Sequence, residues 1–174
     1  TLLPNVNTIA LTATATPTVQ NDIQEKLQFC NPVCFRKSFM RDNLTYVVRK
    51  TEDKERQLLK ILRHVPGTSI VYVNTRKKTE RITQLLKKNG IHTTAYHAGL
   101  TTPARTARQE AWIQGTTRVI VATNAFGMGI DQPNVRSVIH LDLPTTLEAY
   151  YQEAGRAGRD EKKAYTVILY DQQD

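Results

Sequence analysis

Short apolar, strand-like runs alternate with amphipathic, helix-like stretches along most of this chain, and that alternation limits its fold more than any other feature. Most of the strand-like runs are apolar along their whole length, which is typical of strands buried on both faces. The pattern therefore predicts an α/β fold in which a parallel sheet is flanked by helices on both faces. Strand candidates occupy residues 7–15, 33–39, 44–50, 69–74, 91–96, 118–123, 135–143 and 164–170, and helix candidates occupy 17–27, 53–65, 75–89, 103–114 and 145–155.

Residues that start and stop helices lie at the ends of the helix candidates. Thr16 offers an N-cap directly before Pro17, and Gly90 follows the last periodic residue of the stretch at 75–89. In parallel α/β sheets, ligands bind beyond the carboxyl ends of the strands, so a site is expected in the loops there. Those loops occupy residues 74–76, 97–100, 124–131 and 142–146.

The composition narrows the class of partner. A formal net charge of +8 over 174 residues favours a polyanion, nucleic acid first, and scattered solvated lysines are the alternative explanation. No apolar run approaches the roughly 18 residues that a membrane-spanning helix needs, so no membrane partner is expected. The composition shifts near Asn31 and Pro32, which suggests a boundary between a leading unit, residues 1–30, and a main body, residues 31–174.

The chain has two cysteines, Cys30 and Cys34, which are too few for a disulfide framework and suit a reducing compartment. Neither has histidines or further cysteines at metal-binding spacing, so we expect no metal site. We interpret both as small buried apolar side chains.

Two arginines three residues apart, Arg156 and Arg159, are the most suggestive candidates for a site. Each follows a glycine, and Gln152 lies four residues before the first. The rigid, permanently charged guanidinium fork suits bidentate binding of phosphate. A solvated helix end is an equally weighted alternative, because arginine also complements the negative end of a helix dipole.

The loop at 124–131 could bring bare backbone close to a ligand. Gly127 and Gly129 flank Met128, and Asp131 could accept a hydrogen bond from a ribose hydroxyl. The third glycine of a dinucleotide fingerprint is absent, and a turn without a ligand is the alternative. No glycine in the chain is followed by lysine, so the chain lacks a phosphate cradle of the Gly-Lys type and cannot hold triphosphate and metal alone.

Taken together, these segments resemble the second RecA-like domain of a superfamily 2 helicase, most closely a RecQ-family ATP-dependent DNA helicase. They occur in the family's order and at its spacing, and they span nearly the whole chain. "ALTATAT" at 10–16 resembles motif III, "FMRDNL" at 39–44 motif IV, "YVNTR" at 72–76 and "AYHAGL" at 95–100 the next two blocks, "VATNAFGMGIDQPNVR" at 121–136 motif V and "YYQEAGRAGRD" at 150–160 motif VI.

The resemblance implies a role for each matching residue. Arg159 would be the arginine finger, Arg156 a supporting phosphate ligand, and Gln152 the residue that couples them to the rest of the cleft. Gly129 and Asp131 would lie near the nucleotide. The residues expected to contact a single DNA strand are Asn74, Arg76, His97, Gly99 and Thr123.

The resemblance also implies what lies outside this chain. ATP and Mg²⁺ would be held mainly by the first RecA-like domain, and zinc would bind only in the full-length protein. Residues 1–30 would be the trailing strand and helix of that first domain, prone to non-native self-association when cut from their sheet. The piece alone would be inactive, and the whole would be a cytoplasmic or nucleoid-associated 3′–5′ motor acting on single-stranded or forked DNA.

Two positions depart from the family pattern. Motif IV usually reads Phe-Asp-Arg-Pro-Asn, and Met40 and Asp42 replace the acid and the proline here. Asp131 stands where many relatives carry asparagine. A DEAD-box RNA helicase is the first alternative, although it usually begins motif VI with His-Arg-Ile-Gly. A non-catalytic nucleic-acid-binding module and, more distantly, a dinucleotide-binding oxidoreductase are the others.

Overall fold

The computed structural model describes residues 8–12, 15–36, 38, 40–127 and 130–173. The chain divides into two compact units, Thr1–Met40 and Arg41–Asp174.

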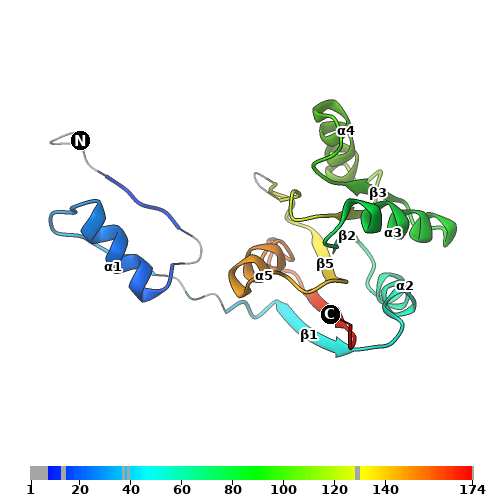
Figure 1. Cartoon of the computed structure of the whole chain (residues 1–174), viewed down its shortest axis with the longest axis horizontal. Helices are drawn as coiled ribbons and strands as arrows, with labels where there is room; N and C mark the ends of the chain where they lie inside the picture. The colour runs from blue at the N-terminus through cyan, green and yellow to red at the C-terminus, as the bar shows by residue number, and fades with distance from the viewer. Residues whose placement is uncertain (1–7, 13–14, 37, 39, 128–129, 174) are drawn as a thin grey trace. The chain divides into compact units, whose positions relative to one another are not determined.

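A six-stranded, wholly parallel sheet forms the centre of the second unit (Figure 1). Its strand order is β1-β6-β5-β2-β4-β3, so strands that are neighbours in space are mostly not neighbours in sequence. The predicted α/β class with a parallel sheet is confirmed. The strands are β1 (Leu44–Lys50), β2 (Thr68–Tyr72), β3 (Thr93–Tyr96), β4 (Val119–Ala122), β5 (Val135–His140) and β6 (Ala164–Tyr170).

The helices of this unit begin where the sequence places capping side chains. The helices are α2 (Lys54–His64), α3 (Arg76–Lys88), α4 (Thr102–Ile113) and α5 (Leu147–Ala154). In each, the side-chain oxygen of the N-cap accepts the backbone N–H three residues on, as between Asp53 and Arg56 at 2.8 Å. Thr75, Thr101 and Thr146 cap the other three helices in the same way. Each cap satisfies a donor that the first turn would otherwise leave unpaired.

Both faces of the sheet are covered, as predicted. On one face, α2 and α3 pack against β2, β4, β5 and β6, through Leu58, Leu62, Ile82, Leu86, Val71, Val121, Ile139 and Val167. On the other, α4 and the loops near α5 cover a second cluster that includes Ile70, Tyr72, Tyr96, Trp112, Ile120, Phe126 and Val138. These two buried layers make the sheet a rigid platform for the loops at its ends.

Trp112 and Phe126 fix the start of the loop that follows β4. Both are buried, and their rings pack edge to face with centroids 5.4 Å apart. The Trp112 indole N–H donates to the Ser69 carbonyl at 3.2 Å. Trp112 is therefore a core residue and does not offer a surface for base stacking. Because Phe126 is anchored beneath it, the loop leaves the sheet from a defined point.

The first unit contains α1 (Pro17–Lys26), which begins as predicted with Pro17 in the first turn and Thr16 as its cap. The strands predicted at 7–15 and 33–39 are wrong for the residues described, since 8–12, 15 and 33–36 form no strand. A strand needs a neighbour to pair its backbone groups, and the described part of this unit supplies none. Ile9, Leu11 and Phe35 are exposed.

The interpretation of the cysteines also needs correction. Cys30 and Cys34 are free and exposed, and not buried. They lie in turns and irregular chain after α1, where no sheet or second helix of the described unit covers them.

Candidate functional site

The segment between α5 and β6, residues 155–162, carries both candidate arginines, and we call it the arginine loop. Its backbone is tied to the start of β5, because Gly158 N–H donates to the Val135 carbonyl at 2.8 Å and Asp160 N–H to the Pro133 carbonyl at 3.2 Å. Gly158 has φ +59°, and an added Cβ would lie 2.8 Å from the Ala164 Cβ. The loop is thus held in a defined conformation by hydrogen bonds and close packing, and it is not a frayed helix end.

Arg156 lies directly against the loop after β4. Its Nη1 donates to the Gly127 carbonyl, and a Cβ added to Gly127, which has φ +147°, would lie 2.2 Å from Arg156 Nη2. Gly127 therefore gives bare backbone for a close approach, as expected, and the group that approaches it is the Arg156 guanidinium. Arg156 Nε is buried and has no hydrogen-bond partner among the described residues.

Arg159 is more open to solvent. Its Nη1 donates to the Ile130 carbonyl at 3.1 Å and to Asp131 Oδ1 at 3.0 Å, while its side chain stays 36% exposed and that of Asp131 84% exposed. Two of the predicted nucleotide residues, Asp131 and Arg159, are therefore in contact. Gly129 lies outside the described residues.

Gln152 is exposed on α5, one turn before Arg156. Among the described residues, no hydrogen bond joins it to Arg156 or Arg159. Its predicted coupling role stays a prediction.

Two residues just before β1 hold the arginine loop, and sequence reasoning gave them no role. Arg41 donates to the carbonyls of Gly155, at 3.3 Å, and Gly158. Asn43 Nδ2 donates to the Gly158 carbonyl at 2.7 Å and to the Lys162 carbonyl at 2.9 Å. The signal available in the sequence was that both survive in the otherwise altered motif IV segment.

Near Arg156, the side chains of Tyr72, His140 and Glu153 form a series of polar and ring contacts that is largely buried. The Tyr72 hydroxyl donates to the Phe126 carbonyl at 3.1 Å, and the Tyr72 ring stacks on His140. His140 Nε2 lies 2.9 Å from Glu153 Oε2. Burial raises the pKa of Tyr72 well above its usual value, and the nearby Arg156 charge opposes that rise. Tyr72 is thus a neutral donor at physiological pH.

The five residues predicted to contact DNA gather at the carboxyl ends of β2, β4 and β3, which are adjacent in the sheet. We call Asn74, Arg76, His97, Gly99 and Thr123 the strand-end cluster. The Thr123 N–H donates to the Tyr96 carbonyl at 3.2 Å, which joins the ends of β4 and β3, and the Asn74 N–H donates to Asp142 Oδ2 at 2.7 Å.

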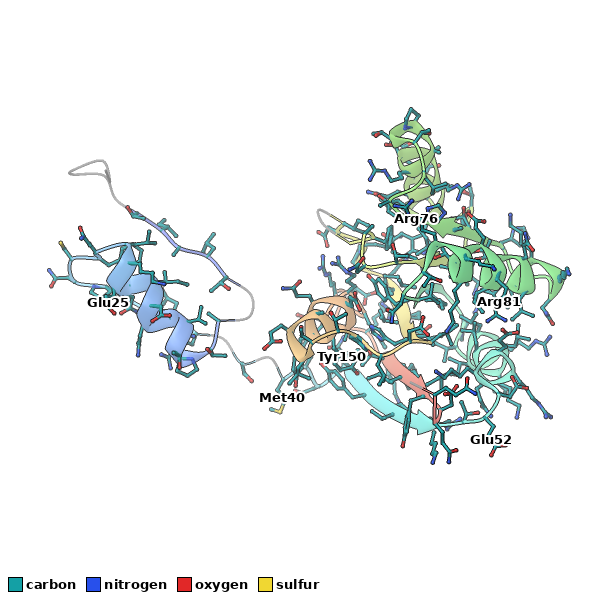
Figure 2. The ribbon with its side chains drawn as sticks, viewed as in Figure 1. Glu25, Met40, Glu52, Arg76, Arg81 and Tyr150 are labelled. Carbon is teal, nitrogen blue, oxygen red and sulfur yellow. The ribbon has the colours of Figure 1, made fainter. Side chains whose placement is uncertain are left out.

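Arg76 and Gly99 lie face to face within this cluster. A Cβ added to Gly99 would lie 2.8 Å from Arg76 Nη1, and Figure 2 shows Arg76 at the start of α3. His97 is buried, and its Nε2 is 3.1 Å from Oε1 of Glu80, which belongs to α3 like Arg76. Asn74, Arg76 and Gly99 are exposed, and Thr123 is mostly buried.

The arginine loop does not lie where loops after strands were expected to form the site. It precedes β6 and packs beside the first residues of β5 and β6, Val135 and Ala164. The strand-end cluster lies at the carboxyl ends of β2, β3 and β4, as predicted. The expectation of a site in the loops after strands therefore covers the strand-end cluster and not the arginine loop, which follows a helix, α5.

In the part of the chain that the structure describes, no group of three or more histidine, cysteine, aspartate or glutamate side chains could hold a metal ion. None of the described helices is both long and apolar enough to cross a membrane.

Solved structures with the same fold are helicase domains. An Escherichia coli DEAD-box protein, SrmB, solved with a regulator of ribonuclease activity, matches with a TM-score of 0.69 and 25% identity over 80% of this chain and 81% of that one. Dbp5 of Saccharomyces cerevisiae, solved with Gle1, matches with a TM-score of 0.72 and 26% identity over 93% of this chain and 43% of that one. The sheet and its layers are thus those of a RecA-like helicase domain.

The family model described as "Helicase conserved C-terminal domain" matches residues 53–161. The chain belongs to this family, and within it to the RecQ-family helicases. It is 45% identical over 98% of its length to the RecQ-like DNA helicase blm-1 of Caenorhabditis elegans. It is 44% identical over 95% of its length to the ATP-dependent DNA helicase RecQ of Bacillus subtilis. The chain spans only 18% and 28% of those two relatives.

Proposed function

We propose that this chain is the second RecA-like domain of an ATP-dependent 3′–5′ DNA helicase, in which it supplies the arginine finger and part of a single-strand track. The observation that carries the proposal is the arginine loop, which holds two guanidinium groups firmly while leaving one of them open to solvent. The full-length protein would work in the cytoplasm or on the nucleoid. Residues 1–30 would belong to the preceding domain, and the chain by itself would hydrolyse nothing.

The donor set of the arginine loop fits the phosphates of a nucleotide. Arg156 keeps a buried Nε without a described partner, and Arg159 bonds to the described residues through Nη1 alone and stays 36% exposed in its side chain. Both charges are permanent and both forks suit phosphate oxygens. ATP with Mg²⁺ would supply the phosphoryl group and the metal charge, and the first RecA-like domain would hold most of both.

In that setting the roles of the two arginines differ. Arg156 is locked against Gly127 and would act as a fixed positive charge beside the phosphates. Arg159 would leave or share its pairing with Asp131 to stabilise the charge that develops during phosphoryl transfer. Asp131 would then be free to accept a hydroxyl of the ribose. Gln152 would report the state of the nucleotide to the rest of the cleft.

The strand-end cluster supports a track for the phosphates of a single strand. Exposed Arg76 and the backbone N–H groups at the start of α3 lie together, which is the arrangement that binds phosphate at helix N-termini. Exposed Gly99 would continue the track at the end of β3, and the largely buried His97 and Thr123 would shape it at the two neighbouring strand ends. The net charge of +8 favours such a polyanion.

An RNA helicase is the second candidate. The fold neighbours are DEAD-box proteins, and one relative, from Acanthamoeba polyphaga mimivirus, is named as an RNA helicase and is 42% identical over 99% of this chain. The comparison that separates the candidates is ATP turnover of the full-length protein with single-stranded DNA and with RNA of the same sequence. We expect DNA to stimulate turnover more strongly, and stronger stimulation by RNA would favour the second candidate.

The arginine finger is tested by Arg159→Ala in the full-length protein. We expect ATP turnover to fall by about 10³ to 10⁵, the contribution of arginine fingers in related phosphoryl transfer. Single-strand binding should be retained. The matched control is Arg81→Ala, which removes another exposed, ion-paired arginine from a different part of the domain. A loss of less than about tenfold, on that same scale, would reject Arg159 as the finger.

A further inference from the structure

Arg136, the second residue of β5, donates to Asp160 of the arginine loop, to Lys163 directly after that loop, and to the two residues before β5. Its Nε donates to the Asn134 carbonyl at 3.0 Å and its Nη1 to the Lys163 carbonyl at 3.1 Å. Its Nη2 donates to Asp160 Oδ1 at 2.5 Å and, more weakly, to the Pro133 carbonyl at 3.4 Å. All three guanidinium nitrogens are therefore used, by acceptors from two segments of the chain.

Asp160 completes the arrangement from the other side. Besides the Arg136 guanidinium, its carboxylate accepts the Lys162 N–H at 3.2 Å, and its own N–H donates to the Pro133 carbonyl. Asp160 follows Arg159 directly in the chain. A displacement of Asp160 would therefore move Arg159 with it.

Two ion pairs thus join the arginine loop to the segment around the start of β5, and each of these two parts supplies the arginine of one pair and the aspartate of the other. Arg159 reaches from the arginine loop to Asp131, and Arg136 reaches from the segment after Asp131 back to Asp160. Their surroundings differ, since the side chains of Arg136 and Asp160 are 17% and 21% exposed, and those of Arg159 and Asp131 are 36% and 84% exposed. Water and salt weaken the open pair much more than the sheltered one.

We propose that Arg136 and Asp160 are positioning residues, a clamp that fixes the arginine loop while the Arg159–Asp131 pair opens. The inference rests on the proposed role of Arg159 and names what keeps that side chain in place. With the clamp closed, Arg159 can exchange Asp131 for a phosphate oxygen by side-chain rotation alone. Without it, the whole loop moves and the guanidinium loses its alignment.

The kinetic consequence follows from where an arginine finger acts. Its contacts form mainly in the transition state, so misalignment lowers kcat more than it raises KM. A shift of about 1 Å in a catalytic group can cost about 10²-fold in rate. Asp160→Asn and Arg136→Gln in the full-length protein should therefore each lower kcat by about 10- to 100-fold, with KM for ATP changed less than about threefold.

The clamp itself is read by hydrogen exchange, independently of turnover. In both variants the amides of Gly158 and Asp160, which are bonded to β5 and the segment before it, should exchange at least about tenfold faster. The Thr123 amide, bonded to Tyr96 in the strand-end cluster, should not change. The double variant should be no worse than either single one, because the two side chains act as a unit.

Two further variants keep the outcome interpretable. Glu55→Gln breaks the exposed Arg81–Glu55 pair and should change neither kcat nor the exchange of the arginine loop. Arg136→Lys keeps the charge and secures folding if Arg136→Gln fails to fold. A single ammonium cannot reach all the acceptors, so this variant should show the same two changes in weaker form.

The possible results separate the inference from the function on which it rests. Faster exchange with unchanged kcat would show that the Arg136–Asp160 contact only stabilises the fold, and unchanged exchange would show that no clamp exists. Either result, together with an inactive Arg159→Ala variant, overturns the inference and leaves the proposed function standing. If Arg159→Ala stays active, the proposed finger role fails and the positioning role fails with it. The exchange data would then still show whether Arg136 and Asp160 hold the loop.

Discussion

The arginine loop and the strand-end cluster present positive charge in two different ways. The arginine loop is fixed by side chains from distant parts of the sequence, Arg41, Asn43 and Arg136, which donate to its carbonyls or its carboxylate. The strand-end cluster is placed by the sheet itself, at the ends of three adjacent strands. The difference suits the two tasks that we propose, since transition-state stabilisation needs exact alignment and a sliding contact with phosphates does not.

The largest expected contrast comes from the same substitution made at two glycines, Gly127, which packs against Arg156 of the arginine loop, and Gly99 of the strand-end cluster. Gly127→Ala would place a Cβ 2.2 Å from Arg156 Nη2 at a residue with φ +147°, so Arg156 must move and the backbone is strained. We expect a loss of about 2–4 kcal/mol in the free energy of unfolding, measured by denaturant titration of the chain.

Gly99→Ala is the matched substitution in the strand-end cluster. Its Cβ would meet the exposed end of Arg76 at 2.8 Å, and a flexible side chain can turn away. We expect less than about 1 kcal/mol of destabilisation, the usual range for surface changes. Equal losses at Gly127 and Gly99 would contradict the view that the surroundings of the arginine loop are packed more tightly than the strand-end cluster.

A smaller contrast compares two asparagines. Asn43→Ala removes the two hydrogen bonds that Asn43 Nδ2 donates to the Gly158 and Lys162 carbonyls, and it should cost about 1–2 kcal/mol of unfolding free energy. Asn74→Ala leaves the Asn74 backbone N–H on Asp142 and should cost less than about 0.5 kcal/mol. Thermal or denaturant unfolding of both variants gives the comparison. A larger loss for Asn74→Ala would mean that the strand-end cluster, too, depends on side-chain bonds.

The smallest effect is a pH dependence confined to the arginine loop. The hydrogen bond from Arg136 is the main reason that the pKa of Asp160 lies below its usual value of 3.8. The charged carboxylate therefore stabilises the fold above pH 3.8, and this contribution disappears as the pH falls through the lowered pKa of the folded state.

Asp160→Asn should accordingly be less stable than the parent chain at neutral pH, and the two should converge as the pH falls below 3.8. Unfolding curves collected at several pH values show this directly. A stability difference that stays constant with pH would mean that the Asp160 charge plays no part.

Sequence patterns predicted the second unit well because its signals are local. Capping residues and apolar periodicity placed α2 to α5, and runs such as 164–170 matched their strands fully. For the residues that the structure describes, the strands predicted at 7–15 and 33–39 were wrong, because an apolar run forms a strand only when another backbone pairs with it. That condition cannot be read from the run itself.

The candidate site divides in the same way. Arg156, Arg159 and the strand-end cluster were predicted from short motifs, and the structure brings the members of each group together. The contacts that hold the arginine loop were missed because they are remote in sequence, since Arg41 and Asn43 bond to carbonyls 114 to 119 residues away. Gln152 remains a prediction, and Gly129 lies outside the described residues.

The central claim is that the two regions perform separable tasks in one full-length motor, and a paired measurement of Arg159→Ala and Arg76→Ala tests it most directly. For each variant, ATP turnover is measured with saturating single-stranded DNA, and DNA affinity is measured at several salt concentrations. Arg159→Ala should lose about 10³-fold or more in turnover and keep the salt slope of the parent protein. Arg76→Ala should keep most turnover and lose about 0.7 from the slope of log K against log salt, the contribution of one single-strand phosphate. If both variants lost turnover and DNA affinity alike, the division of the site into two tasks would be contradicted.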